Sequence, residues 1–86
     1  MPVWNRTIDL RPAVQLFKTD ADISATAEKA VEIIEKSGWL ADTPYPDTLR
    51  DHLNGLKQAT TPDEYITAFD RIYDVADEDR VWIETT

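Results

Sequence analysis

The sequence predicts a mainly α-helical fold, a three-helix bundle with a small two-stranded ribbon formed by the N- and C-terminal segments. Three observations predict it. Three segments carry apolar residues at helical spacing, the last of them opens on a capping-box sequence, and both chain ends are rich in β-branched and aromatic residues. With 86 residues, 42% of them hydrophobic and 30% charged, the chain is expected to form a single domain, residues 1–86.

The N-terminal stretch VWNRTIDL, residues 3–10, alternates as a short strand does. One face of that strand would carry Trp4, Arg6, Ile8 and Leu10. Pro12 then limits continuation of regular structure. The next segment, AVQLFK at residues 13–18, is compatible with a single helical turn or with a buried loop.

The first helix is predicted from about Ser24 to Lys36. Its start is indicated by Asp20 and Asp22, because the helix dipole favours negative charge there. Its buried stripe comprises Ile23, Ala27, Ala30, Val31 and Ile34. Gly38 is expected to end the helix in the left-handed conformation, with Trp39 folding back onto the last turn.

A loop is predicted at residues 41–47, ADTPYPD, and Pro46 suits the first position of a second helix that runs to about Ala59. The apolar line of this helix comprises Tyr45, Leu49, Leu53 and Leu56. His52, the only imidazole, falls at the border of that line. A packing or surface role is expected for it, and a role as general base or ligand is the alternative.

The third helix has the clearest start signal, because Thr61, Pro62 and Glu64 occupy the positions of a capping box. Its buried stripe comprises Tyr65, Phe69, Ile72, Tyr73 and Ala76. Beyond Asp79 the run Val-Trp-Ile at residues 81–83 favours a terminal strand, although a helix extended through Trp82 is also compatible. If both ends are strands, they can pair and bring Trp4 and Trp82 onto one ribbon packed on the helices.

The residue inventory argues against an enzyme. There is no cysteine for a disulfide, a thiol nucleophile or a structural zinc site. The two glycines form no phosphate-binding loop, the two serines lie in no nucleophile elbow, and the acidic segments lack the spacing of a calcium loop. We therefore predict no catalytic residue, no metal ligand and no cofactor. The alternative is a small enzyme that uses His52 with a neighbouring carboxylate.

Charge is distributed unevenly along the chain. The formal net charge is −8, of which residues 61–86 contribute −6. Such a segment repels nucleic acid and anionic membranes, so neither is expected as a direct partner, and a basic protein surface is favoured. The sequence contains no apolar run of membrane-spanning length and no signal peptide, so a cytoplasmic location is expected.

The acids of the third helix form the candidate binding site. At 100° per residue, Asp63, Asp70, Asp74 and Asp77 fall on one side of the helix, and we call these four residues the acid ridge. Glu78 extends the acidic surface, and Trp82 is the candidate aromatic anchor. A solvated helix face is the plainer interpretation. The functional interpretation is docking of a basic partner, and its sharper form is mimicry of DNA phosphates that blocks a DNA-binding enzyme of the restriction or CRISPR type.

The two chain ends, VWNRTIDL and YDVADEDRVWIETT, resemble short acidic proteins carried by phages of actinobacteria, most of them without an assigned function. The resemblance covers about 22 residues. It implies a phage accessory protein that acts in the host cytoplasm through a host protein, and it carries over no catalytic residue. A homo-oligomer that pairs its terminal strands edge to edge is a further alternative.

Overall fold

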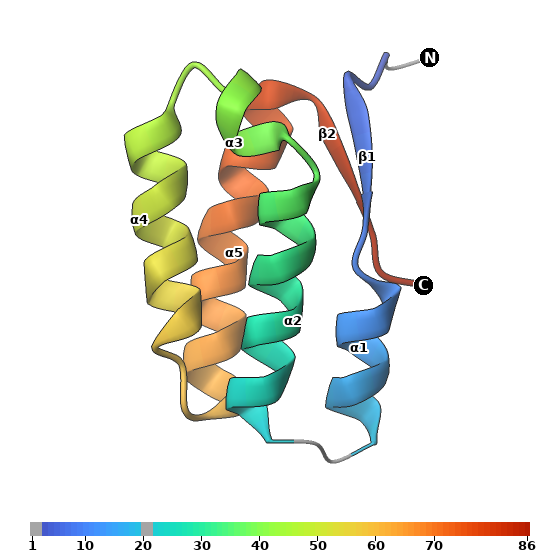
Figure 1. Ribbon diagram of the computed structural model, residues 1–86, viewed down its shortest axis with the longest axis vertical. Coiled ribbons are helices and arrows are strands. Elements are labelled where there is room, and N and C mark those ends of the chain that lie inside the picture. Colours follow the sequence, from blue (N-terminus) through green and yellow to red (C-terminus); the bar gives the residue numbers. More distant parts are fainter. Residues whose placement is uncertain (1–2, 20–21) are drawn as a thin grey trace.

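A computed structural model describes residues 3–19 and 22–86 of the chain (Figure 1). Within these ranges it contains five helices and two strands. In chain order they are β1 (Arg6–Asp9), α1 (Arg11–Lys18), α2 (Ile23–Lys36), α3 (Trp39–Asp42), α4 (Pro46–Lys57), α5 (Pro62–Asp79) and β2 (Val81–Glu84). The prediction of a mainly helical chain whose two ends form a two-stranded sheet is confirmed. The helices outnumber the three predicted, because α1 and α3 add to α2, α4 and α5.

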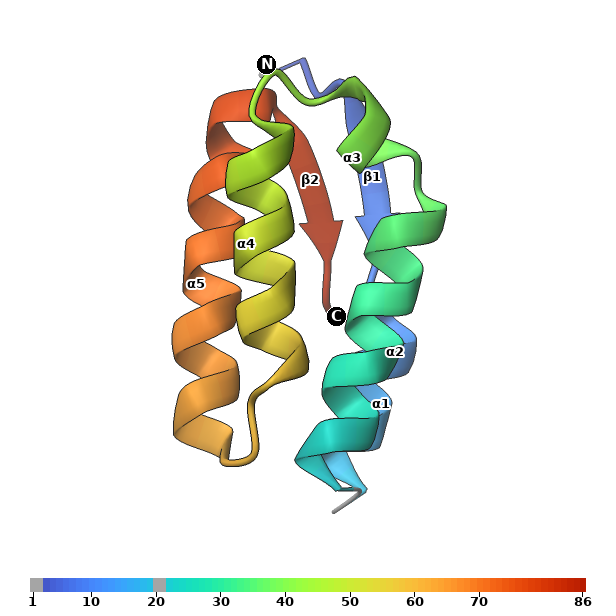
Figure 2. The same ribbon diagram turned by 60° about the vertical axis from the view of Figure 1, so that its left-hand side comes forward.

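The two strands pair in parallel, with Arg6 opposite Val81 and Asp9 opposite Glu84, and both views show them side by side (Figures 1 and 2). Ile8 of β1 and Ile83 of β2 face each other in this register, and both are buried. The predicted strand face is only partly correct. The chain bends at Asn5, ahead of β1, and Trp4 is 39% exposed rather than in line with Ile8.

The segment after β1 forms the eight-residue helix α1, in place of the single turn or loop predicted. Pro12 does not interrupt it, because a proline in the first turn lacks only an N–H that would have no partner within the helix. The backbone N–H groups of Ala13 and Val14 both donate to the carbonyl of Leu10. α1 packs against α2.

The start and end of α2 follow the predicted signals. Asp22 caps the helix by accepting a hydrogen bond from the Ser24 backbone N–H at 3.2 Å, while Asp20 lies outside the described residues. Gly38 has a φ of +85°, as expected of a left-handed helix end. Beyond Gly38 the chain forms the short helix α3, which ends at Asp42. The predicted loop at residues 41–47 is therefore reduced to residues 43–45, between α3 and α4.

α4 begins at Pro46 as predicted and ends at Lys57 rather than near Ala59. Leu49, Leu53 and Leu56 are buried, but Tyr45, at the start of the predicted apolar line, is 47% exposed. α5 begins with the predicted cap, in which the Thr61 hydroxyl accepts a hydrogen bond from the Glu64 N–H at 3.2 Å. Arg80 ends α5 with a φ of +56°, and β2 then returns alongside the helix, so the alternative of a helix through Trp82 is wrong.

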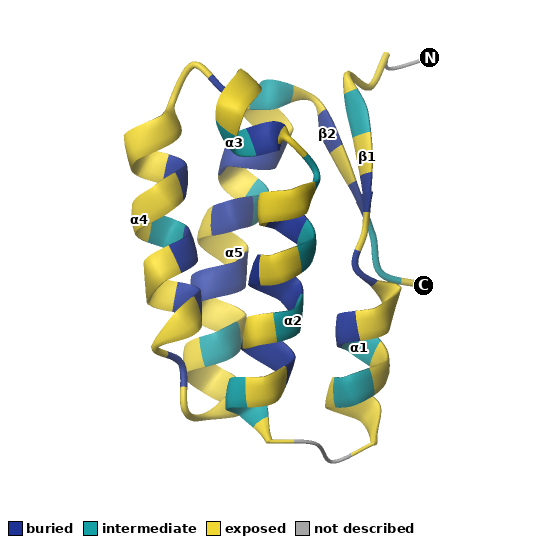
Figure 3. Ribbon diagram, in the orientation of Figure 1, coloured by how far each residue is buried: buried dark blue, intermediate teal, exposed yellow. Residues whose placement is uncertain are grey.

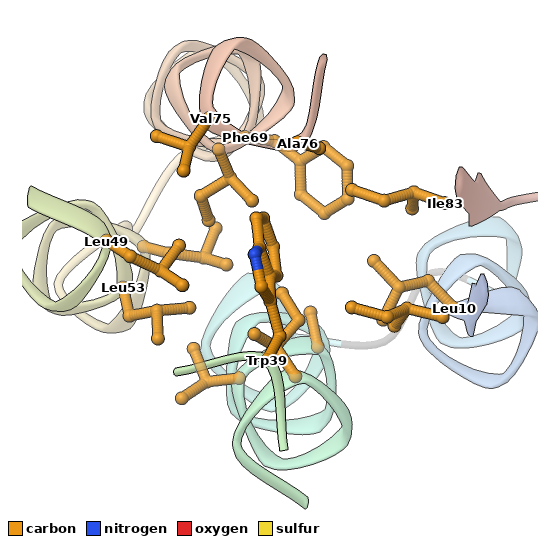
Figure 4. Close-up of a cluster of buried hydrophobic side chains, with 14 of the residues drawn as sticks. Leu10, Trp39, Leu49, Leu53, Phe69, Val75, Ala76 and Ile83 are labelled. Atoms are coloured by element: carbon orange, nitrogen blue, oxygen red, sulfur yellow. The ribbon is translucent and has the colours of Figure 1, made fainter. Parts of the chain in front are cut away.

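The core lies between α2, α4, α5 and the ribbon, and buried positions lie on the sides of these elements that face one another (Figure 3). Trp39 is its largest fully buried side chain. In Figure 4 the indole points from α3 into the middle of the cluster, with Leu49 and Leu53 on one side and Leu10 and Ile83 on the other. Within the part of the chain that the structure describes, no helix is both long enough and apolar enough to cross a membrane.

Candidate functional site

The acid ridge lies on the outer side of α5. All four of its aspartates are exposed, and so is Glu78. Ile72, which has no exposed surface, marks the inward side of the same helix. The exposed acidic side of α5 is as predicted, but the predicted buried stripe is only partly correct. Phe69, Ile72 and Ala76 are buried, whereas Tyr65 and Tyr73 are only partly buried.

Ion pairs are formed by acids elsewhere in the chain. The five pairs found among residues 3–19 and 22–86 are Arg6–Asp42, Arg11–Asp9, Lys36–Glu32, Arg50–Asp47 and Lys57–Glu35. None of them involves a residue of α5. Exposed acids of β1, α2, α3 and α4 are thus partly neutralised by ion pairs. Among the residues described, no ion pair neutralises the acid ridge.

Asp79, the last residue of α5, has a structural role instead. Its Oδ2 accepts hydrogen bonds from the Trp39 Nε1 at 2.8 Å and from the Thr43 hydroxyl at 2.6 Å. Its backbone carbonyl accepts a third from the Asn5 side-chain amide at 2.9 Å. Asp79 therefore joins the C-terminus of α5 to α3 and Thr43 through its carboxylate, and to the segment before β1 through its backbone carbonyl. No local sequence signal indicates this role, because Trp39 and Asp79 are 40 positions apart.

Two residues of the acidic surface turn toward α4. Asp74 and Glu78 line a depression of about 220 Å³ together with His52, which is half-buried. The expectation that His52 lies at the border of the α4 apolar line agrees with this position. Among the described residues no group of three or more His, Asp or Glu side chains is arranged to hold a metal ion.

An aromatic groove lies along the other side of the acid ridge. It has a volume of about 230 Å³ and is lined by Val14 and Phe17 of α1, Tyr65, Ile66, Phe69 and Tyr73 of α5, and Thr85. The four aromatic rings of the groove form a continuous run. Their centroids are 5.8 Å apart from Phe17 to Tyr65, 5.7 Å from Tyr65 to Phe69 and 5.0 Å from Phe69 to Tyr73. Burial is the main cause that raises the pKa of the Tyr65 hydroxyl.

The sequence did not predict this groove, because its second wall is α1. For that segment the sequence was compatible with either a helical turn or a loop. The available signal is Ile66, an apolar residue placed just outside the buried stripe of α5. It is 50% exposed, and Phe17 across the groove is 38% exposed. Two large apolar side chains thus remain accessible beside the acid ridge.

Trp82 lies on the outer face of the ribbon rather than on α5. It is 44% exposed and packs edge-on against Trp4, with ring centroids 5.3 Å apart, so the predicted meeting of the two tryptophans is confirmed. The Trp82 Nε1 donates to the Glu84 carboxylate at 3.2 Å. That hydrogen bond is the first cause of the lowered pKa of Glu84. Trp82 is accessible to a partner, but as part of a tryptophan pair.

Comparisons of the chain with protein-family models, with curated proteins and with solved structures found no match.

Proposed function

We propose that the protein is a non-enzymatic interaction module that docks on a basic protein surface through the acid ridge. The observation that carries the proposal is the contrast between the acid ridge and the other acids: its four aspartates are exposed and form no ion pair with any described residue, while acids of β1, α2, α3 and α4 do. Lysines or arginines of a partner would supply the missing counter-charges.

The arrangement has a cost in the free protein. Asp70 and Asp74 stand at i,i+4, where like charges destabilise a helix by a few tenths of a kcal/mol. A basic partner removes this repulsion on binding. Electrostatic attraction of this kind accelerates association and weakens as salt is added, so binding should be strongly salt-dependent.

The test compares two variants of equal charge. The ridge variant carries Asp70→Lys, Asp74→Lys and Asp77→Lys. The α2 control variant carries lysine in place of three exposed glutamates on another helix, Glu28, Glu32 and Glu35. Affinity capture from the cells in which the protein acts should recover a basic partner with the wild type and the α2 control variant but not with the ridge variant. The proposal fails if the wild type captures no partner or if the ridge variant retains it.

Two further features belong to the proposal. Exposed Trp82 is a second contact, and Trp82→Ala is expected to weaken the captured complex without unfolding the chain. The resemblance of the chain ends to short acidic phage proteins favours a host protein as the partner, bound in the host cytoplasm as an accessory or inhibitory interaction.

DNA mimicry is the narrower alternative. What favours it is that Asp63 to Asp77 lie on one uninterrupted helix of 18 residues, so that the carboxylates form a row about 21 Å long. In that case the partner is a DNA-binding enzyme, and duplex DNA should compete with the protein for it. If saturating duplex DNA leaves the captured complex intact, mimicry is excluded and docking on another basic surface remains.

Edge-to-edge assembly is the structural alternative. In the described part of the chain the sheet has two strands, so β1 and β2 each leave one edge unpaired. Light scattering decides the matter, because a monomer at all concentrations removes this alternative.

A further inference from the structure

We propose that the aromatic groove binds a basic amphipathic helix of the partner. The apolar face of that helix fills the groove, and its lysines or arginines lie over the acid ridge. The inference rests on the proposed function and names the kind of partner segment that the same side of α5 binds. The aromatic groove is open, because no other part of the described chain fills it.

The groove and the acid ridge are two sides of one surface. On a helix, residues three and four positions apart are neighbours. Ile66 in the groove therefore adjoins Asp63 and Asp70, and Tyr73 adjoins Asp70 and Asp77. Three aspartates form the rim of the aromatic groove along its length, so an occupant that is apolar on one side and basic on the next meets complementary groups on both.

The shape of the groove favours side chains of a protein over a small molecule. Its volume of about 230 Å³ is below the range of about 300–1,000 Å³ typical of small-molecule pockets. Its walls are α1 and the part of α5 from Tyr65 to Tyr73, each of which extends for about 12 Å. That length matches two turns of a helix, which would place apolar side chains at positions i, i+3 or i+4, and i+7.

Charge favours a basic helix over two other possible occupants of the groove, an anionic membrane and a second copy of the chain. An anionic membrane is repelled by the rim aspartates, although the groove is apolar. A second copy of the chain would bring together two molecules that each carry a net charge of −8. A basic helix is not repelled, because its positive charges neutralise the rim aspartates while its apolar side chains are buried in the groove.

The test uses two fluorescent peptides of about 14 residues, roughly four helical turns. The amphipathic peptide consists of leucine and lysine, with leucines at i, i+3, i+4 and i+7. The scrambled peptide has the same composition without that spacing. The groove variant carries Phe17→Ser and Ile66→Ser, and its matched control carries Val3→Ser and Tyr45→Ser, which replace exposed apolar side chains outside the groove. Circular dichroism verifies that every variant is folded.

Fluorescence anisotropy should show that the wild type binds the amphipathic peptide at least about tenfold more tightly than the scrambled one, since burying each leucine contributes more than the free energy of a tenfold change in affinity. The groove variant should lose this preference, its control should keep it, and the ridge variant should bind neither peptide. Equal binding of both peptides by the wild type overturns the inference and leaves docking on the acid ridge intact. Binding of neither peptide overturns both proposals.

Two other results also overturn the inference. One is groove-dependent binding of the protein to vesicles of phosphatidylcholine with or without phosphatidylserine, which makes lipid the occupant. The other is a dimer in sedimentation analysis that the groove variant abolishes, which makes a second copy the occupant.

Discussion

Asp79→Ala tests the structural role of Asp79, which distinguishes this residue from the exposed acids of the acid ridge. The substitution removes the acceptor of two hydrogen bonds, and both donors are buried: Trp39 is 1% exposed and Thr43 is 8% exposed. A buried donor left without a partner costs about 1–3 kcal/mol. Because the Thr43 hydroxyl can rotate toward another acceptor, we place the total loss in the free energy of unfolding at about 2–4 kcal/mol.

Urea denaturation followed by far-ultraviolet circular dichroism measures this loss. With a slope of about 1.5 kcal/mol per molar urea, a loss of 3 kcal/mol lowers the midpoint by about 2 M. Asp77→Ala is the matched control, since it removes an exposed carboxylate from the same turn, and it should change the free energy of unfolding by less than about 0.5 kcal/mol. If both variants unfold at the same urea concentration, the structural role of Asp79 is wrong.

Three further substitutions test the remaining local arguments. Gly38→Ala should destabilise the chain by about 1–2 kcal/mol in urea, because Gly38 has a φ of +85° and an added Cβ would lie 3.3 Å from the Arg6 guanidinium. Gly55→Ala should stabilise it by up to about 1 kcal/mol, because that site in α4 is open and helical, and a loss of stability there would contradict the reasoning. Hydrogen bonding from Arg11 lowers the pKa of Asp9 to about 2 from 3.8, so Arg11→Gln should return it toward 3.8 in an NMR titration, and an unchanged pKa would contradict that cause. Since the pKa is lowered in the folded state, the stabilisation by this pair is complete above about pH 4 and is lost as the pH falls through 2.

Local signals predict the elements that begin or end on a defined cap. Thr61 and Glu64 indicate the start of α5, and Gly38 indicates the end of α2, because these residues satisfy backbone groups within one turn. Periodicity likewise identifies the buried sides of α2 and α5. These features depend only on neighbours in the sequence, so the sequence is sufficient to predict them.

Contacts between distant segments are what the sequence leaves open. The parallel direction of the ribbon depends on how the chain leaves α5. Arg80 takes a left-handed conformation there, and the sequence does not indicate it, because the residue is not a glycine. The hydrogen bond from Trp39 to Asp79 and the aromatic groove between α1 and α5 both join segments far apart in the chain. As a result, the acid ridge is predictable from helical spacing, while the groove beside it is not.

The acids of the C-terminal segment therefore have two different roles. Asp79 holds α5 to α3, whereas the acid ridge is exposed, and three of its aspartates adjoin the side chains of the aromatic groove. Only the second group is free to meet a partner. A stability measurement is expected to respond to the first group and a binding measurement to the second.

The most direct test of the central claim is the affinity of the captured partner for the ridge variant, measured by isothermal titration calorimetry beside the wild type and the α2 control variant. Reversing three charges at the interface should weaken binding by about a hundredfold, or roughly 1 kcal/mol for each residue, while the α2 control variant should bind within about threefold of the wild type. Equal affinity of the partner for the wild type and the ridge variant would show that the acid ridge is only a solvated helix face.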